Sequence, residues 1–278
     1  MSHKTALLFL HGVGSGDQND NWKAALDRAL TDVGYPQLDE AEVAAPKYAF
    51  ALRGSDDNDP LPGVTIKAPS GEARKRNRRD FDRRMVAVEM RLGRHDRGVG
   101  WFGGDQVIDN ALGLRSFEQA KNYLTNRQIR AQVLNRVLRG LPKSDSLVIV
   151  GHSLGSVIAA DLLRRLPVGL EVAGLITIGS PLAHPSFDPG DLRAELTEPP
   201  QNLAWWVNFW NPADPVTAHR GVSSVFPWMM DSRIQPKVNL QAHDAETYLA
   251  DEAVATTVGY ALFGSLSRTL VVAERGID

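Results

Sequence analysis

The stretch Leu147-Val148-Ile149-Val150-Gly151-His152-Ser153-Leu154-Gly155 decides the fold of this chain. Four consecutive aliphatic residues, three of them β-branched, predict a strand that is buried on both faces, as strands of parallel sheets are. Apolar residues then follow at helical spacing from Leu154 to Leu166 and predict a helix. Because only three residues separate the two patterns, Ser153 lies on a sharp turn between a strand and a helix. Such a unit is typical of an α/β protein.

Short apolar runs alternate with helical patterns over most of the chain, which is typical of β–α–β units and a mostly parallel sheet. We expect strands at Ala6–Leu10, roughly Glu42–Ala45, Ser146–Val150, Gly174–Ile178, Leu203–Asn208 and Pro236–Leu240. We expect helices at Trp22–Val33, Phe117–Arg139 and Leu154–Leu166. The second helix opens with Ser116-x-x-Gln119, the pattern of a capping box. The sequence thus predicts one α/β domain over residues 1–278, with a central sheet flanked by helices.

The region from about residue 53 to residue 114 interrupts this alternation, because it holds no convincing strand. Its segment Glu72–Asp96 is rich in Lys and Arg, which indicates a solvated helix face or, as the alternative, a patch for an anionic ligand or a membrane surface. Glycines then surround Trp101 and Phe102. We expect an insertion that forms a cap or lid, with these two aromatic residues facing substrate or lipid. Their alternative role is to anchor the insertion in a static core.

Composition restricts the class of protein. The chain has 278 residues, of which 43% are hydrophobic and 23% are charged, and these ordinary fractions exclude wholesale disorder. The net charge of −2 provides no basic surplus for binding nucleic acid. The absence of Cys excludes a thiol nucleophile, a Cys-based zinc site and disulfides. Because no apolar run is long enough for a membrane span or a signal-peptide core, we expect a cytoplasmic protein.

The pentapeptide Gly151-His152-Ser153-Leu154-Gly155 matches the pattern G-x-S-x-G, which carries little weight alone. Its position between a predicted strand and a predicted helix makes the match informative, because a nucleophile elbow lies directly between a strand and a helix. Glycines at both ends allow the two backbones to approach closely. The start of the helix also brings positive dipole density beside the serine, where a negative oxygen would form. Ser153 as a simple helix N-cap is the alternative interpretation.

Four further segments accompany this pentapeptide. They are a hydrophobic strand that ends in His11-Gly12, Gly179-Ser180-Pro181 after the next strand, the loop Asn211–Val216, and His243 with Tyr248 five residues later. Together with the pentapeptide they resemble the α/β-hydrolase superfamily, in its lipase and esterase branch. The resemblance covers residues 4–50 and 116–262. It implies an α/β-hydrolase fold, with the insertion as a cap.

The resemblance implies a catalytic triad in the chain order serine, acid, histidine, with Ser153 as the nucleophile. Asp214 is the expected acid, because prolines on both sides restrain its loop, and Asp188 and Asp191 are its rivals. His243 is the expected base, because it follows the predicted last strand. The rival base, His219, lies only five residues after Asp214 and leaves no room for a strand between them.

The resemblance also implies that the backbone N–H groups of Val13 and Leu154 hold the oxyanion, with Gly14 as the alternative to Val13. His11 is expected to brace this loop. The expected activity is hydrolysis of carboxylic esters of small molecules or lipids, without a cofactor or a metal. No nucleic-acid partner is expected, transient contact with a membrane surface stays open, and the oligomeric state is not indicated.

Two alternatives to an esterase remain at this point. A thioesterase, an amidase or an acyltransferase uses the same three side chains. A catalytically silent member of the fold would serve as a binding module, against which the presence of serine, aspartate and histidine argues.

Overall fold

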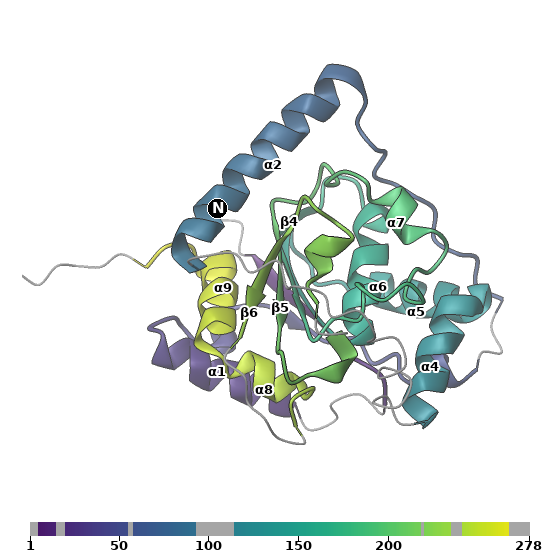
Figure 1. The fold of residues 1–278 in the computed structure, drawn as a ribbon, viewed down its shortest axis with the longest axis horizontal. Coiled ribbons are helices and arrows are strands. Elements are labelled where there is room, and N and C mark those ends of the chain that lie inside the picture. The colour runs from purple at the N-terminus through teal and green to yellow at the C-terminus, as the bar shows by residue number, and fades with distance from the viewer. Residues whose placement is uncertain are drawn as a thin grey trace, which may run out of the picture.

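Figure 1 shows a computed structural model of the chain. The structure describes residues 5–14, 20–54, 58–92, 114–217, 220–234 and 241–266, with the backbone alone for residues 114–117. The expectations for His219, for Trp101 and Phe102, and for a strand at Pro236–Leu240 lie outside these residues.

A parallel sheet of six strands forms the centre of the described part of the chain. The strands are β1 (Ala6–Leu10), β2 (Val43–Ala44), β3 (Ser146–His152), β4 (Glu171–Ile178), β5 (Trp206–Trp210) and β6 (Met230–Arg233). Their order across the sheet is β2-β1-β3-β4-β5-β6, and every neighbouring pair is parallel. The prediction of an α/β protein with a parallel sheet is therefore confirmed.

Helices cover both faces of the sheet (Figure 1). The helices of the described residues are α1 (Asn21–Asp32), α2 (Gly71–Leu92), α4 (Leu114–Thr125), α5 (Arg127–Arg139), α6 (Leu154–Leu162), α7 (Leu192–Glu195), α8 (Ala245–Leu249) and α9 (Glu252–Phe263). Alternate residues of the strands enter two different cores, since successive side chains point to opposite faces. Leu8 and Ile149 pack in the core that α4, α5 and α6 cover, whereas Phe9 and Val150 pack in the core beneath α1, α8 and α9.

The predicted helix Phe117–Arg139 is wrong in one respect, because the chain forms two helices there. Asn126 stands between α4 and α5, and its side-chain oxygen accepts hydrogen bonds from the N–H groups of Gln128 (2.9 Å) and Ile129 (3.2 Å). An asparagine that caps a new helix in this way ends the preceding one. The predicted capping box is also wrong, because α4 already begins at Leu114.

Strand β6 was not anticipated by the sequence pattern, because it contains Asp231 and Ser232. Asp231 is fully buried, and its carboxylate accepts hydrogen bonds from the Asn208 side chain on β5 and from the backbone of Val222, each at 2.9 Å. Burial raises the pKa of Asp231 above its ordinary value. These partners allow a polar residue to occupy a buried strand.

The described part of the insertion consists of residues 53–54, the segment 58–70 and the long helix α2, and most residues of α2 are exposed. This helix lies at the end of the sheet where the strands begin, opposite α8 (Figure 1). Asn77 donates to the carbonyl of Pro199 (2.7 Å), Arg84 donates to that of Ala204 (2.9 Å) just before β5, and Phe81 packs edge-on against Trp228. Helix α2 itself therefore does not cover the candidate site, and most of its surface is exposed. The expected cap also includes residues 93–113, which lie outside the described residues. No helix among the described residues has the length and apolarity that a membrane span needs.

Candidate active site

The turn between β3 and α6 places Ser153 in a backbone conformation that is rare for residues other than glycine. Its φ is 54° and its ψ is −125°. The turn is held by the N–H of Ser153, which donates to the carbonyl of Ile178 (3.1 Å), and by the N–H of Ser156, which donates to the carbonyl of Ser153 (2.9 Å). Such a strained strand-to-helix turn raises the serine side chain out of the sheet.

Two glycines allow the close packing around this turn. A Cβ atom on Gly155 would lie 2.0 Å from the carbonyl oxygen of Leu10, so only glycine lets the start of α6 approach the end of β1. A Cβ atom on Gly12 would lie 2.8 Å from Cβ of Ser153. The loop after β1 therefore lies directly against the serine.

Ser153, His243 and Asp214 form a chain of hydrogen bonds at the carboxyl end of the sheet. His243 Nε2 lies 3.0 Å from Ser153 Oγ, and His243 Nδ1 lies 2.8 Å from Asp214 Oδ2. Because a carboxylate only accepts hydrogen bonds, Nδ1 carries the ring proton and Nε2 is free to accept from the serine hydroxyl. This is the tautomer in which the imidazole can take the proton of Ser153.

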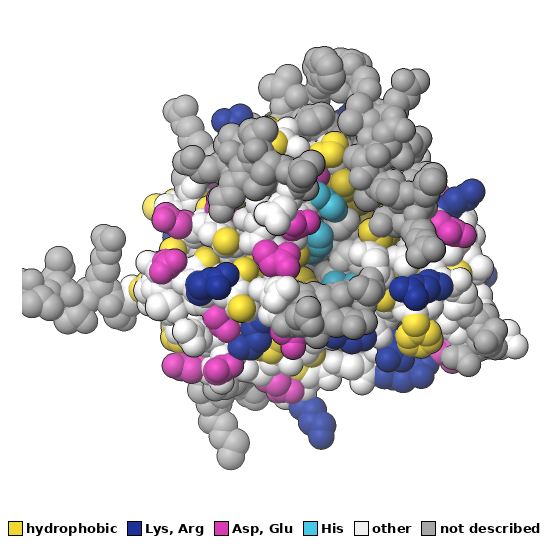
Figure 2. Space-filling view, turned by 90° about the horizontal axis from the view of Figure 1, so that it is seen from below, with side chains coloured by type: hydrophobic (Ala, Val, Ile, Leu, Met, Phe, Trp, Pro, Cys, Tyr) yellow, Lys and Arg dark blue, Asp and Glu magenta, His cyan; other side chains and the backbone are white. Residues whose placement is uncertain are grey.

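Burial differs along this chain of hydrogen bonds. Asp214 is fully buried, and its second carboxylate oxygen accepts from the N–H of Val216 (2.9 Å). The side chain of His243 is 26% exposed, so a substrate can reach it. Figure 2 shows histidine side chains near the centre of the face that is seen from below in Figure 1. The three residues thus lead from the interior to an accessible surface.

Tyr248 is a partner of Asp214 to which the sequence assigned no role. Its hydroxyl donates to Asp214 Oδ2 (2.7 Å) and accepts from the N–H of Asn211 (3.1 Å). Burial and the neighbouring Asp214 carboxylate raise the pKa of Tyr248 well above its ordinary value, so the hydroxyl stays a donor. The same carboxylate oxygen therefore receives the Tyr248 and His243 hydrogen bonds together. In the sequence, the only sign of this arrangement is that Tyr248 follows His243 by five residues. The structure connects both residues to Asp214.

The two backbone donors predicted for an oxyanion belong to the start of α6 and to the loop after β1, and both segments adjoin Ser153. Leu154 is the first residue of α6, so its N–H has no acceptor within the helix. Val13 directly follows Gly12 and is half-buried. The N–H of Gly14 donates to Oε1 of Gln119 (2.6 Å), which makes Val13 the better candidate of the two.

The loop that carries Val13 is braced from two sides. The ring of His11 stacks on that of Tyr48 with centroids 4.0 Å apart, and the Tyr48 hydroxyl donates to the carbonyl of His11. Gln119 of α4 holds Gly14 from the other side. His11 thus braces the loop, as predicted, and Gln119, which the sequence pattern places in a capping box, is a further brace.

The rival acids contact other parts of the chain. Asp188 accepts from the N–H of Arg193 (2.9 Å), and Asp191 precedes α7 with a φ of 60°. Both therefore shape the loop around α7, whereas Asp214 is the residue in contact with His243.

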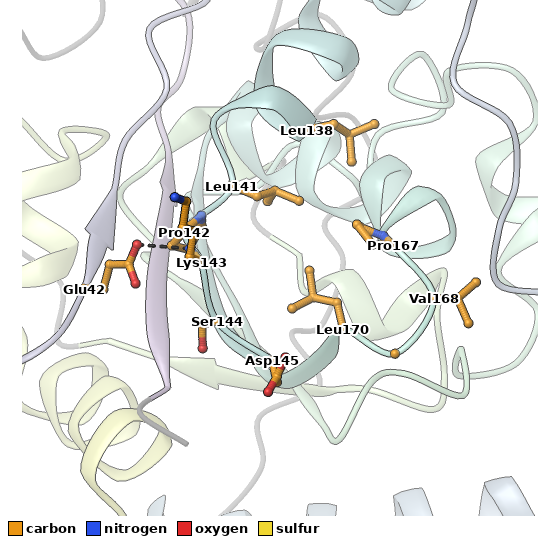
Figure 3. Close-up of a pocket in the computed structure, with 11 residues that line it drawn as sticks. Glu42, Leu138, Leu141, Pro142, Lys143, Ser144, Asp145, Pro167, Val168 and Leu170 are labelled. Carbon is orange, nitrogen blue, oxygen red and sulfur yellow. Dashed lines mark hydrogen bonds between the residues drawn. The ribbon is translucent and has the colours of Figure 1, made fainter. Parts of the chain in front are cut away.

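A hollow of about 840 Å³ lies at the opposite end of the sheet, between the residues that precede β3 and those that precede β4 (Figure 3). Leu138, Leu141 and Leu170 line it, and the N–H of Lys143 donates to the Glu42 carboxylate (3.0 Å) at its edge. Since Ser153 follows the other end of β3, this hollow is separate from the candidate active site.

No protein-family model matches this chain, and no curated protein sequence matches it significantly. Among the residues that the structure describes, no group of three His, Asp or Glu side chains is placed to hold a metal ion. The chemistry of the site is therefore inferred from its own geometry.

Proposed function

We propose that this protein is a serine hydrolase of the α/β-hydrolase fold that cleaves carboxylic esters of small molecules or lipids. The observation that carries the proposal is the continuous hydrogen-bonded chain from Ser153 through His243 to Asp214. The strained turn at Ser153 supports it, because a helix N-cap needs no such conformation.

In the acylation step, Ser153 Oγ attacks the ester carbonyl carbon while His243 Nε2 takes the hydroxyl proton. The imidazolium that forms is stabilised by Asp214, which stays ionised. Collapse of the tetrahedral intermediate breaks the bond to the alcohol oxygen, and His243 returns its proton to that leaving alkoxide. An acyl-enzyme on Ser153 and a free alcohol result.

In the deacylation step, His243 removes a proton from water, which attacks the acyl carbonyl carbon. The second tetrahedral intermediate releases Ser153 Oγ, which regains its proton from His243, and the carboxylic acid leaves. Both intermediates carry a negative oxygen, which in this proposal is bound by the N–H groups of Val13 and Leu154. A single donor of this kind typically contributes about 10²–10³ in rate, because it is already oriented before the charge forms.

Labelling with a fluorophosphonate probe tests this proposal, because the probe reacts only with an activated serine. We expect wild-type protein to be labelled and the Ser153→Ala variant to be unlabelled, with ester turnover lower by about 10³ or more. Folding of the variant is checked by circular dichroism. Unlabelled wild-type protein, or normal turnover in a folded Ser153→Ala variant, would contradict the proposal.

Activity on matched substrates separates the ester from the other acyl groups that the same three residues can cleave. A panel of p-nitrophenyl esters with acyl chains of two to sixteen carbons is compared with a thioester and an anilide of the same acyl groups. We expect the esters to be the better substrates. Faster turnover of the thioester or the anilide would reassign the enzyme to that class.

A further inference from the structure

His152, the residue before the serine, contacts the main chain of His243, whereas Asp214 contacts the His243 side chain. Its Nε2 lies 2.7 Å from the main-chain carbonyl oxygen of His243. The two imidazole rings lie 4.9 Å apart, centroid to centroid. The mechanism described above uses the side chain of His243 and leaves the His152 contact without a role.

The partner of His152 determines its protonation. A carbonyl oxygen only accepts hydrogen bonds, so Nε2 of His152 carries a proton. Burial and the neighbouring His243 lower the pKa of His152 to about 3, which keeps its ring neutral near pH 7. Its Nδ1 therefore carries no proton, and a neutral ring adds no positive charge beside the base.

The imidazole ring of His152 lies between Ser153, the loop after β1 at Gly12, and the loop before α8. His152 is fixed to Ser153 by the chain itself, and a Cβ atom on Gly12 would lie 3.3 Å from its Nδ1. The loop before α8 has other ties, since the Asn211 side chain donates to the carbonyl of Ala242 (3.2 Å) and Thr247 donates to that of Gln241 (2.9 Å). The carbonyl of His243 is the point at which this loop is joined to the residue next to the nucleophile.

We propose that His152 is a positioning residue that holds the main chain of His243, so that its imidazole faces Ser153 Oγ. The inference rests on the proposed function. Asp214 orients the ring of His243 through its side chain, and His152 fixes the backbone from which that ring projects. Two anchors of this kind restrict both the rotation and the displacement of the base.

Three variants test the proposal with soluble p-nitrophenyl esters. His152→Phe keeps a planar ring and removes the donor, whereas His152→Gln keeps an N–H group at the same distance along the side chain. Thr247→Ala is the matched control, because it removes a donor to another carbonyl of the same loop. Melting temperatures and circular dichroism are recorded for all three.

We expect His152→Phe to lower kcat by about 10-fold to 100-fold with KM nearly unchanged, since small displacements of a catalytic group have effects of this size. His152→Gln should recover most of that loss, and Thr247→Ala should keep the wild-type kcat. A folded His152→Phe variant with wild-type kcat overturns the proposal, and so does a His152→Gln variant that is as slow as His152→Phe.

Histidine ¹⁵N nuclear magnetic resonance on wild-type protein gives a readout that needs neither activity nor the folding of His152→Phe. The signals of His152 are those lost in His152→Gln. We expect a neutral ring with the proton on Nε2 between pH 5 and 8, and titration near the ordinary histidine pKa of about 6.5 overturns the proposal. Unlabelled wild-type protein in the fluorophosphonate experiment overturns the proposed function instead, whatever the tautomer of His152.

Discussion

At the scale of single residues, the reactivity proposed for Ser153 depends on the partners of His243 more than on the serine. A serine hydroxyl is a weak nucleophile unless a base removes its proton as it attacks. His243 is 3.0 Å from that hydroxyl, and Asp214 selects the ring tautomer that leaves the nearer nitrogen free to accept. Replacing the acid therefore tests the whole arrangement without touching the nucleophile.

For Asp214→Asn we expect a folded protein whose kcat falls by about 10⁴, because an amide at this position favours the wrong tautomer of the histidine. The control is Asp188→Asn, which changes a carboxylate that binds the backbone of Arg193. Steady-state kinetics on one soluble ester provide the comparison. If Asp188→Asn abolishes turnover and Asp214→Asn does not, the acid is misassigned.

Tyr248 allows a second test at this scale. Tyr248→Phe removes a buried donor to Asp214, and we expect a loss of stability of about 1–3 kcal/mol together with a lower kcat. The control is Tyr123→Phe, because Tyr123 is also fully buried and donates to a buried carboxylate, that of Asp161 (2.7 Å). It should cost similar stability and leave kcat unchanged. Equal effects of the two variants on kcat would show that Tyr248 has only a structural role.

At the scale of elements, the sequence predicts best where local signals agree. The unit of β3, turn and α6 is predictable because an aliphatic run, two glycines and a helical pattern follow one another within a few residues. The break between α4 and α5 at Asn126 is not predictable. Apolar residues continue at helical spacing on both sides of it, and the cap depends on local backbone geometry. Strand β6 is not predictable for a different reason, since the partners that satisfy Asp231 lie on another strand and on the turn at Val222, and only the fold brings them to the carboxylate.

Helix α4 allows a test of the loop after β1, which carries Val13 and Gly14. Gln119→Ala removes the acceptor that holds the N–H of Gly14, and we expect a lower kcat with a small change in melting temperature. Gln119→Glu keeps a carbonyl-type oxygen and should retain most of the activity. Asn126→Ala is the control for effects on α4 and α5, because it should cost about 1 kcal/mol of stability and leave kcat unchanged. Wild-type kcat in Gln119→Ala would show that the brace is not needed.

At the scale of the whole molecule, the candidate catalytic residues lie at one end of the sheet, and α2 lies at the other. Ser153, Asp214 and His243 lie where strands end, as the order of segments along the chain predicts for a parallel sheet. Helix α2 and the hollow beside Leu170 lie where strands begin (Figures 1 and 3). The position of α2 was not predictable, because it is fixed by single contacts such as that between Phe81 and Trp228, which follow from the tertiary fold.

This separation of the two ends predicts that α2 affects stability and not catalysis. Phe81 is fully buried and packs edge-on against Trp228 with ring centroids 5.4 Å apart. Phe81→Ala should lower the free energy of unfolding by about 3–5 kcal/mol, since it leaves a cavity in the core, as measured by urea denaturation. The control is Met90→Ser on the same helix, which changes a side chain that is 83% exposed and should leave stability unchanged.

The kinetic part of this prediction is measured on the folded protein at low temperature. Because α2 contacts the segments that precede β5 and β6, Phe81→Ala should keep the wild-type kcat and the wild-type preference for acyl chain length. A helix that covered the substrate would give the opposite pattern, with selective loss of activity on long acyl chains and little change in unfolding. Observing that pattern would move α2 to the active site and contradict the arrangement described here.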